Sequence, residues 1–453
     1  MIIRRIYCLV LAILLVMTVV GCAAETTTPE TTEPAVDTTV PETEIAQAEE
    51  PVVAPAPEGG VTLSLLANQD WVTKPYMRAA WENYEAQTGN TLDIQAVPID
   101  TGGNIMQIRF ATGEIPDIFM HFGGHGLTPF QPEANFVDFS DAFWVSDIQD
   151  YVLAQTKFNG RIYGLPHWEA SVSGLLYNRE IFDDLGLELP RTQAEFEAVC
   201  DALLAAGITP IYLAFSDVWP LLYQFGVDPL VADSAVLDQL NSNQITYADM
   251  PGFRDLVGWY LTLVERQYIG TRFTTNTWDG AAEALASGEY AMIYAWDSWA
   301  YSDVEPVFPG YAAKFGIMPA FMASEDRGAF PGPNVCLSFA HKNGPNVDAA
   351  IAYINFLATP ENYNIAFAGF ATAPVFFGQT THQATSAYLG SKDWIAERGF
   401  SSIAWPFIFG FTQVDAARYL QDLMLGNIDV DEAIRLMDQD RIEIARTQQI
   451  PGF

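Results

Sequence analysis

Two spacings of apolar residues alternate along the body of the chain. The stretch VTLSLLA, from residue 61, alternates apolar and polar side chains as a half-buried strand does. The next stretch, PYMRAAWENYEAQTG, has the spacing of a helix that ends at Gly89. One face of that helix carries Met77, Ala80, Trp81 and Tyr84. Strands at TLDIQAVPI and IFM then enclose another helical stretch, so the order predicts an α/β fold with a parallel sheet.

The same two spacings continue to the C-terminus. Thr192 and Glu195 form a capping box for a helix that carries Cys200, and Gly207 with Pro210 closes it. Further strands are expected at residues 208–215, 291–296, 315–321 and 334–342. Further helices are expected at residues 253–269, 278–290, 349–364 and 430–446. A chain of 453 residues exceeds what one hydrophobic core usually fills, so two lobes are expected.

The first residues predict a lipoprotein signal. Arg4 and Arg5 precede an apolar run over residues 6–20, which is too short for a secure membrane span. The run ends in VVGC, which resembles the bacterial lipobox, so Cys22 is expected to carry the lipid and residues 1–22 to form the signal segment. Residues 23–60 contain no basic or aromatic residue and are rich in Thr, Pro and Glu, which predicts a disordered tether.

Composition limits the partners. The formal net charge is -35, which argues against a nucleic-acid partner because phosphate contacts require clustered Lys and Arg.

Cys200 and Cys336 are isolated and no CxxC occurs, so we expect buried free thiols rather than metal or redox chemistry, although a disulfide is possible. We expect no cofactor and no metal. His121 and His125 are four residues apart, but Gly123 and Gly124 between them argue against a helical zinc site.

One segment breaks the apolar pattern. Between the apolar pieces YGLP and GLLYN the chain places His167, Trp168 and Glu169, where a buried connection would favour hydrocarbon. Polar side chains in such a position require a partner or a ligand.

Five motifs carry a resemblance to a known family. They are ATGEIPDIF, GRIYGLP with GLLYNREIFDDLGLELPRTQAEF, LASGEYAMIYAW, LGNIDVDEAI and the early helix ending in AQTG. In this order they resemble the extracellular (family 1) solute-binding proteins of bacterial ABC importers, in the carbohydrate-binding group that includes maltose-binding protein. His121 replaces a family aromatic residue and Gly124 a family carboxylate, so the resemblance does not extend to maltose as ligand.

The resemblance implies an α/β, two-lobed periplasmic-binding-protein-like (type II) fold with a hinge of crossing strands. The first lobe would comprise residues 61–168 plus 332–385 and the second residues 169–331 plus 386–453. A sugar or oligosaccharide would bind in the cleft between the lobes. The protein would be a monomer outside the cytoplasmic membrane, held there only by its lipid, and would deliver the sugar to permease subunits and their ATPase.

The chemistry of sugars indicates which residues are candidate ligand contacts. Pyranose rings stack on indoles, and sugar hydroxyls bind carboxylates and amides. Trp81, Trp259 and Trp394 have the spacing of core residues, whereas other tryptophans, Trp168 and Trp278 among them, fall in turns or at strand ends. The predicted ligand contacts are Trp71, His121, Glu169, Trp219, Trp296, Asp297, Trp299, Asn334 and Trp405. For Trp299 we expect a ring that is partly exposed until sugar covers it, and Glu169 has a hinge salt bridge as its alternative role.

Two alternatives to a sugar-binding protein stay open. A secreted glycosidase would need two carboxylates facing each other across one cleft, which sequence spacing neither shows nor excludes. A binding protein for another small solute, such as a polyamine, would suit an acidic cleft lined with aromatic rings. No nucleophile elbow, Walker loop or zinc motif occurs, so we expect no enzyme.

Overall fold

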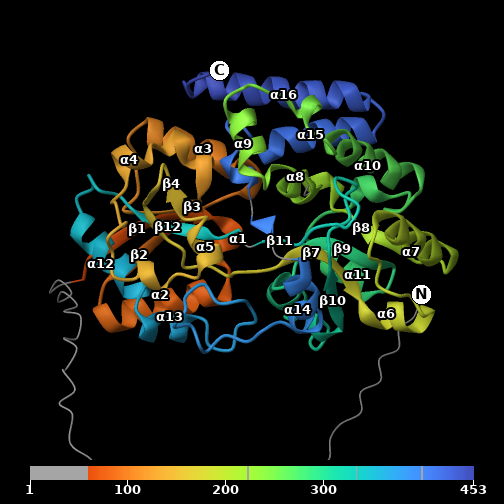
Figure 1. The fold of residues 1–453 in the computed structure, drawn as a ribbon. Helices are drawn as coiled ribbons and strands as arrows, with labels where there is room; N and C mark the ends of the chain where they lie inside the picture. Colours follow the sequence, from red (N-terminus) through yellow and green to blue (C-terminus); the bar gives the residue numbers. More distant parts are fainter. Residues whose placement is uncertain (1–59, 222–223, 333, 399–400, 403) are drawn as a thin grey trace, which may run out of the picture. The chain divides into compact units, whose positions relative to one another are not determined.

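Two β-sheets organise the chain (Figure 1). The computed structural model describes residues 60–221, 224–332, 334–398, 401–402 and 404–453, and the predicted signal segment and almost all of the predicted tether lie outside them. The strands of the first sheet are β1 (Thr62–Asn68), β2 (Thr91–Val97), β3 (Ile118–Phe122), β6 (Gly164–Leu165) and β12 (Cys336–Ala340). Their order is β2-β1-β3-β12-β6. The first three are parallel, whereas β12 runs antiparallel to both of its neighbours.

The second sheet is built from later segments. Its strands are β7 (Ser173–Asn178), β8 (Thr209–Tyr212), β9 (Tyr290–Trp296) and β10 (Phe315–Met318). Their order is β10-β7-β9-β8, with β8 parallel to β9 and the other pairs antiparallel. Two short pairs complete the strands: β4 (Lys157–Phe158) with β5 (Arg161–Ile162), and β11 (Pro331–Gly332) with β13 (Ser401–Ser402).

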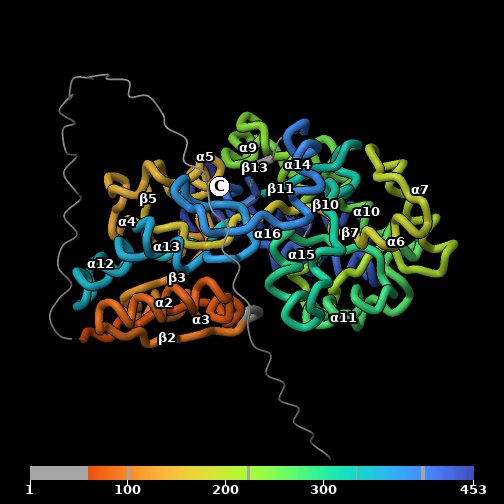
Figure 2. Tube along the Cα trace, turned by 90° about the horizontal axis from the view of Figure 1, so that it is seen from below, coloured from red at the N-terminus to blue at the C-terminus, as the bar shows by residue number. Residues whose placement is uncertain are grey.

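Helices from residues 69–153 and 347–366 accompany the first sheet. They are α1 (Gln69–Val72), α2 (Pro75–Thr88), α3 (Ile99–Ala111), α4 (Pro132–Asn135), α5 (Asp150–Leu153), α12 (Val347–Leu357) and α13 (Pro360–Ala366). Pro75 opens α2 at its first turn, where a missing N–H is tolerated, and Gly89 ends it in the left-handed conformation with φ 70°. The apolar face of α2 packs against α12 and α13, as Figure 2 also shows for α13.

The helices of the second sheet form another group. They are α6 (Arg179–Leu185), α7 (Gln193–Ala205), α8 (Gln224–Val231), α9 (Ser234–Asn241), α10 (Phe253–Glu265), α11 (Ala281–Ala286), α14 (Ser386–Arg398), α15 (Gln413–Met424) and α16 (Val430–Thr447). Here α10 packs against α15 and α16, and α14 against β10 (Figure 1). None of the helices in the described part of the chain is long and apolar enough to cross a membrane.

Each sheet has its own hydrophobic core. The first core takes its buried residues from 63–170 and 335–376, and the second from 172–330 and 387–437. Cys200 and Cys336 are buried free thiols in different cores, as predicted, and burial raises the pKa of both well above the ordinary range. The three tryptophans expected in the core are buried: Trp81, Trp259 and Trp394.

Several predicted elements differ in extent. The helix predicted over residues 349–364 is two helices, because Pro360 cannot continue α12 and instead opens α13. The helix predicted over residues 278–290 shortens to Ala281–Ala286, which Gly280 precedes and Gly288 follows with φ 77°. The cap of α7 also departs from a strict capping box: the Thr192 side chain accepts from the Glu195 N–H, but the Glu195 carboxylate accepts from the Arg191 N–H.

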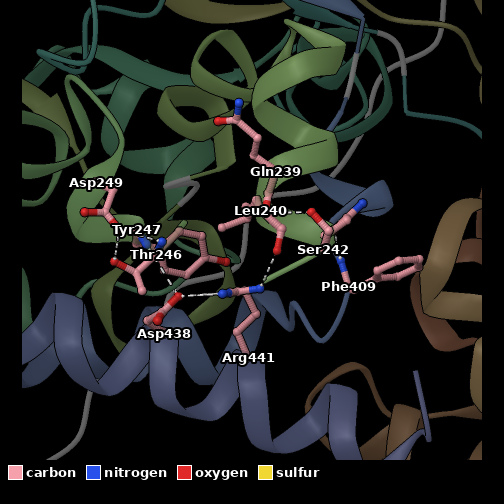
Figure 3. Close-up of polar contacts among 10 residues, drawn as sticks. Gln239, Leu240, Ser242, Thr246, Tyr247, Asp249, Phe409, Asp438 and Arg441 are labelled. Carbon is pink, nitrogen blue, oxygen red and sulfur yellow. Dashed lines mark hydrogen bonds and ion pairs between the residues drawn. The ribbon is translucent and has the colours of Figure 1, made fainter. Parts of the chain in front are cut away.

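A buried ion pair fixes α16 to the connection after α9 (Figure 3). Arg441 is 1% exposed, and its guanidinium lies 2.9 Å from Oδ1 of Asp438 on the same helix. The Arg441 guanidinium also donates to the carbonyl oxygen of Leu240 at 3.1 Å. The backbone N–H of Tyr247 donates to the Asp438 carboxylate at 3.4 Å. One guanidinium therefore ties the C-terminal helix to a segment about 200 positions earlier.

Candidate functional site

Polar and aromatic residues lie at or just after the ends of strands in both sheets. Asp70 and Trp71 follow β1, His121 lies in β3, and Trp296 ends β9. Parallel strands place their carboxyl ends at one edge of a sheet, and ligands of open α/β sheets bind outside such edges. The residues between β6 and β7 connect the two sheets beside these strand ends.

Lys74 joins this connection to the start of α2. Its Nζ lies 3.7 Å from Oε1 of Glu169 and 3.8 Å from Oδ2 of Asp303, in the π-helical turn Ala300–Val304. Glu169 is only 4% exposed. The structure therefore contains the salt bridge that was the alternative role for Glu169. Its partner Lys74 and the neighbouring Asp303 were not among the predicted contacts.

Burial and neighbouring charges set the electrostatics of this group. Burial raises the pKa of Glu169, and the Lys74 ammonium only partly offsets that rise. Burial also acts to lower the pKa of Lys74, but Glu169, Asp303 and Asp70 together outweigh it, so the Lys74 pKa is raised. Asp70 lies at the surface, but neighbouring residues partly desolvate its carboxyl. This desolvation and the charges of Asp303 and Asp279 raise its pKa, despite Lys74. These carboxylates are therefore close enough to repel one another.

The other polar residues of the connection are buried. Trp168 packs edge-to-face on Trp71 and Tyr76, with ring centroids 5.9 and 5.7 Å apart, and belongs to the first core. His167 is 1% exposed, its ring lies 5.2 Å from that of Phe367, and burial lowers its pKa to about 4. The imidazole is therefore neutral at physiological pH.

Asp297 ties the connection to the end of β9. Its Oδ1 accepts from the Val172 N–H at 2.8 Å, and its Oδ2 accepts from the Thr385 hydroxyl. Burial raises the Asp297 pKa to about 6. Since both oxygens already have partners within the chain, burial of Asp297 is explained without a ligand, and its predicted ligand contact is untested.

Four indoles meet beyond the ends of β8 and β9. We call Trp219, Trp278, Trp296 and Trp299 the tryptophan cluster. Trp278 is its centre: its ring centroid lies 5.6 Å from that of Trp296 at an interplanar angle of 20°, 4.8 Å from that of Trp219 and 5.5 Å from that of Trp299. Trp219, Trp278 and Trp296 are each half-buried. The sequence analysis placed Trp278 among turn residues but did not select it.

The expectation of a partly exposed Trp299 ring is wrong. Trp299 is 1% exposed and its ring centroid lies 6.4 Å from that of Phe315 in the second core. Trp299 is the N-cap of the π-helical turn Ala300–Val304, three residues after the end of β9. Its predicted ligand contact would require a rearrangement of this core.

The remaining predicted contacts are more dispersed. Trp71 is 8% exposed, with its ring 5.1 Å from that of Phe122, and burial lowers the pKa of His121. Asn334 and Trp405 are half-buried, and no ring contact or hydrogen bond described in the structure joins either to the tryptophan cluster or to Glu169. No group of three metal-ligating side chains occurs among the residues described.

Asp228 supports the backbone before Trp405. It lies in α8 with 0% exposure, and its Oδ1 accepts from the N–H groups of Ala404 and Trp405 at 2.7 and 2.9 Å. Burial raises its pKa from 3.8 to about 8, although both N–H groups act to lower it. The folded protein therefore holds this carboxyl protonated at neutral pH.

A raised aspartate pKa makes stability depend on pH. The unfolded chain loses the Asp228 proton near pH 4 but the folded chain near pH 8, so the stability of wild type should fall between these values relative to Asp228→Asn. The amide keeps the acceptor oxygen without the charge. We expect the difference in unfolding free energy between the two proteins to change by about 1.4 kcal/mol per pH unit within this range. Urea unfolding at a series of pH values measures it, with the exposed Asp238→Asn as the control that shows no such change.

Comparisons with known proteins identify the class to which this fold and site belong. The model of the bacterial extracellular solute-binding protein family matches residues 70–364, more than half of the chain. The chain belongs to this family. Its fold is the two-lobed α/β fold that the sequence predicts, since solved solute-binding proteins share it over nearly their whole length.

Individual relatives are distant. The chain is 24% identical to a multiple sugar-binding protein of Streptococcus mutans over 131 residues, which cover 29% of the chain and 31% of that protein. It is 24% identical to the melibiose/raffinose/stachyose-binding protein MelE of Bacillus subtilis over 270 residues, 57% of the chain and 61% of MelE. The aligned regions thus span less than two thirds of either relative.

Solved structures match a larger share of the chain than these relatives do. A Bacillus licheniformis sugar transporter in complex with stachyose is 18% identical, with a TM-score of 0.70 over 85% of this chain and 100% of that one. A chitin oligosaccharide binding protein is 20% identical, with a TM-score of 0.72 over 85% of this chain and 99% of that one. At these identities the likeness establishes the fold and not the ligand.

Proposed function

We propose that the protein captures a sugar or oligosaccharide outside the cytoplasmic membrane and delivers it to the permease subunits and ATPase of an ABC importer. The observation that carries the proposal is the half-buried indole of Trp278, which stacks on Trp296 and is followed in the chain by the exposed Asp279. Indole faces bind the C–H faces of pyranoses, and carboxylates bind their hydroxyls. The names of the two curated relatives support the same class of ligand.

We propose two lobes that close on the sugar, divided as the sequence analysis expects: residues 61–168 plus 332–385 and residues 169–331 plus 386–453. The residue ranges of the two cores support this division. Lys74 supports a role for the connecting segment, because it contacts both Glu169 in that segment and Asp303 beyond β9. A ligand that binds the closed arrangement better shifts the population toward it.

Replacing Trp278 with alanine should remove most of the sugar affinity. The substitution removes the stacking surface at the centre of the tryptophan cluster, so we expect at least a tenfold loss, about 1.4 kcal/mol. The measurement is calorimetric titration with a panel that includes stachyose, raffinose and chitin oligosaccharides. The control is Trp394→Ala, a core indole packed on Phe330, which should lower the melting temperature and leave affinity unchanged.

The panel also separates the proposed function from its alternatives. Failure of every sugar in the panel to bind would contradict sugar capture. Release of reducing sugar from glycosides would indicate the secreted glycosidase instead, since hydrolysis requires a pair of carboxylates acting across the cleft.

Cys22 should anchor the protein. In the proposed lipobox its thiol receives the lipid, so Cys22→Ser should move the protein from the membrane fraction to the soluble fraction. A Cys8→Ser variant is the control, because the removed signal segment would take Cys8 with it. Unchanged membrane association of Cys22→Ser after cell fractionation would rule out the lipid anchor.

A further inference from the structure

Three carboxylates lie near Lys74, and a fourth, that of Asp279, lies near one of them, Asp70. We call Asp70, Glu169, Asp279 and Asp303 the acidic group. Glu169 and Asp303 contact the Lys74 ammonium directly at 3.7 and 3.8 Å. Asp279 and Asp303 both raise the pKa of Asp70 by their charge. Asp70 and Asp279 are exposed, the Asp303 side chain is 37% exposed, and Glu169 is buried, so the group extends from the surface into the protein.

The acidic group has more negative charge than the chain neutralises. Lys74 is the only cation among the described residues whose charges shift the pKa values of Asp70 and Glu169. Lys74 itself is nearly buried, with 12% of its side chain exposed, and one ammonium cannot balance four carboxylates. Carboxylates that repel one another in a partly buried site favour a further cation.

One oxygen of the acidic group is an unused acceptor. Glu169 Oε1 faces Lys74, but its Oε2 is buried and accepts no hydrogen bond of normal geometry from the described residues, although the nearby Ser298 hydroxyl acts to lower the Glu169 pKa. A buried acceptor without a donor costs roughly 1 to 3 kcal/mol, and more for a charged group. An ammonium presents three donors and would satisfy such an oxygen.

The acidic group adjoins the proposed sugar-stacking surface. Asp279 directly follows Trp278, the centre of the tryptophan cluster. Indole faces also attract cations. A pyranose that stacks on the indoles therefore presents its substituents beside carboxylates.

We propose that the sugar bound at this site carries a protonated amine, as an oligosaccharide of glucosamine does, and that the amine binds at the acidic group. This inference rests on the proposed function and specifies its ligand. The flat surface of stacked indoles fits a pyranose ring better than a flexible aliphatic polyamine, which would use the carboxylates alone.

The test is calorimetric titration of the full chain with two ligands that differ at the amino group, which is a protonated amine in one and a neutral acetamide in the other. The probes are a glucosamine oligosaccharide and the N-acetylated oligosaccharide of the same length. We expect the amine form to bind at least tenfold more tightly, about 1.4 kcal/mol. Asp279→Asn and Asp303→Asn should each reduce this ratio severalfold, whereas Asp93→Asn, an exposed substitution in β2, should leave it unchanged.

The outcomes distinguish the inference from the proposed function. Equal or tighter binding of the N-acetylated form overturns the inference and leaves sugar capture intact. Spermidine binding as tight as that of the glucosamine oligosaccharide also overturns it, because the site would then select charge without a sugar ring. If neither oligosaccharide binds and no neutral sugar of the panel binds, both proposals fail.

Discussion

Trp299→Ala should lower the free energy of unfolding by roughly 3 to 5 kcal/mol, because it empties a large volume of the second core. The ring is 1% exposed and packs between Trp278 and Phe315. Its Nε1 has no hydrogen-bond partner among the described residues, so the loss reflects packing. Urea unfolding followed by circular dichroism measures the change.

Trp405→Ala is the control for this prediction. Trp405 is also an aromatic residue near a strand, but it is half-buried, with its ring 5.4 Å from that of Phe411. Replacing Trp405 with alanine should lower the free energy of unfolding clearly less than replacing Trp299 does. A Trp299→Ala variant of native stability that no longer binds sugar would show instead that Trp299 is a ligand contact.

Arg441→Ala should destabilise the protein by about 3 to 5 kcal/mol, because it leaves the Asp438 carboxylate charged and poorly solvated. It also removes the donor to the Leu240 carbonyl and with it the tie between α16 and the end of α9 (Figure 3). The same unfolding experiment measures the loss. Arg446→Ala is the control, since this residue lies on the same helix but is exposed.

A double substitution tests whether the unpaired charge of Asp438 causes the loss of stability in Arg441→Ala. Arg441→Met with Asp438→Leu removes both charges of the pair, and such replacements are often neutral. We expect it to recover much of the stability lost in Arg441→Ala. A double variant as unstable as the single one would show that the hydrogen bond to Leu240 or the packing of the arginine stem matters more than the charge.

Local patterns predicted most elements, because their causes are local. The apolar face of α2 and its stop at Gly89 are encoded within the same few residues, and the cap of α7 is set by Thr192. α11 and α12 were predicted too long, because the helical spacing of apolar residues continues past Gly288 and Pro360. The family motifs predicted the two-lobed fold because their order spans almost the whole body.

The site was predicted only in part, because its contacts join distant segments. Nothing near Lys74 in the sequence indicates Asp303 as its partner, and the pair forms only when the start of α2 and the turn after β9 meet. Trp299 has the position of a binding residue, but its core partner Phe315 comes from β10. Trp278 becomes the centre of a cluster only because β8 and β9 are neighbours.

The position of β12 also determines when the first sheet can be completed during synthesis. This strand lies between β3 and β6, yet the ribosome makes it long after both of them. Until residues 336–340 emerge, neither β3 nor β6 can pair with β12. The contacts that complete the sheet therefore join segments that are far apart in the sequence. The nascent N-terminal half therefore cannot complete its native sheet before most of the chain has been made.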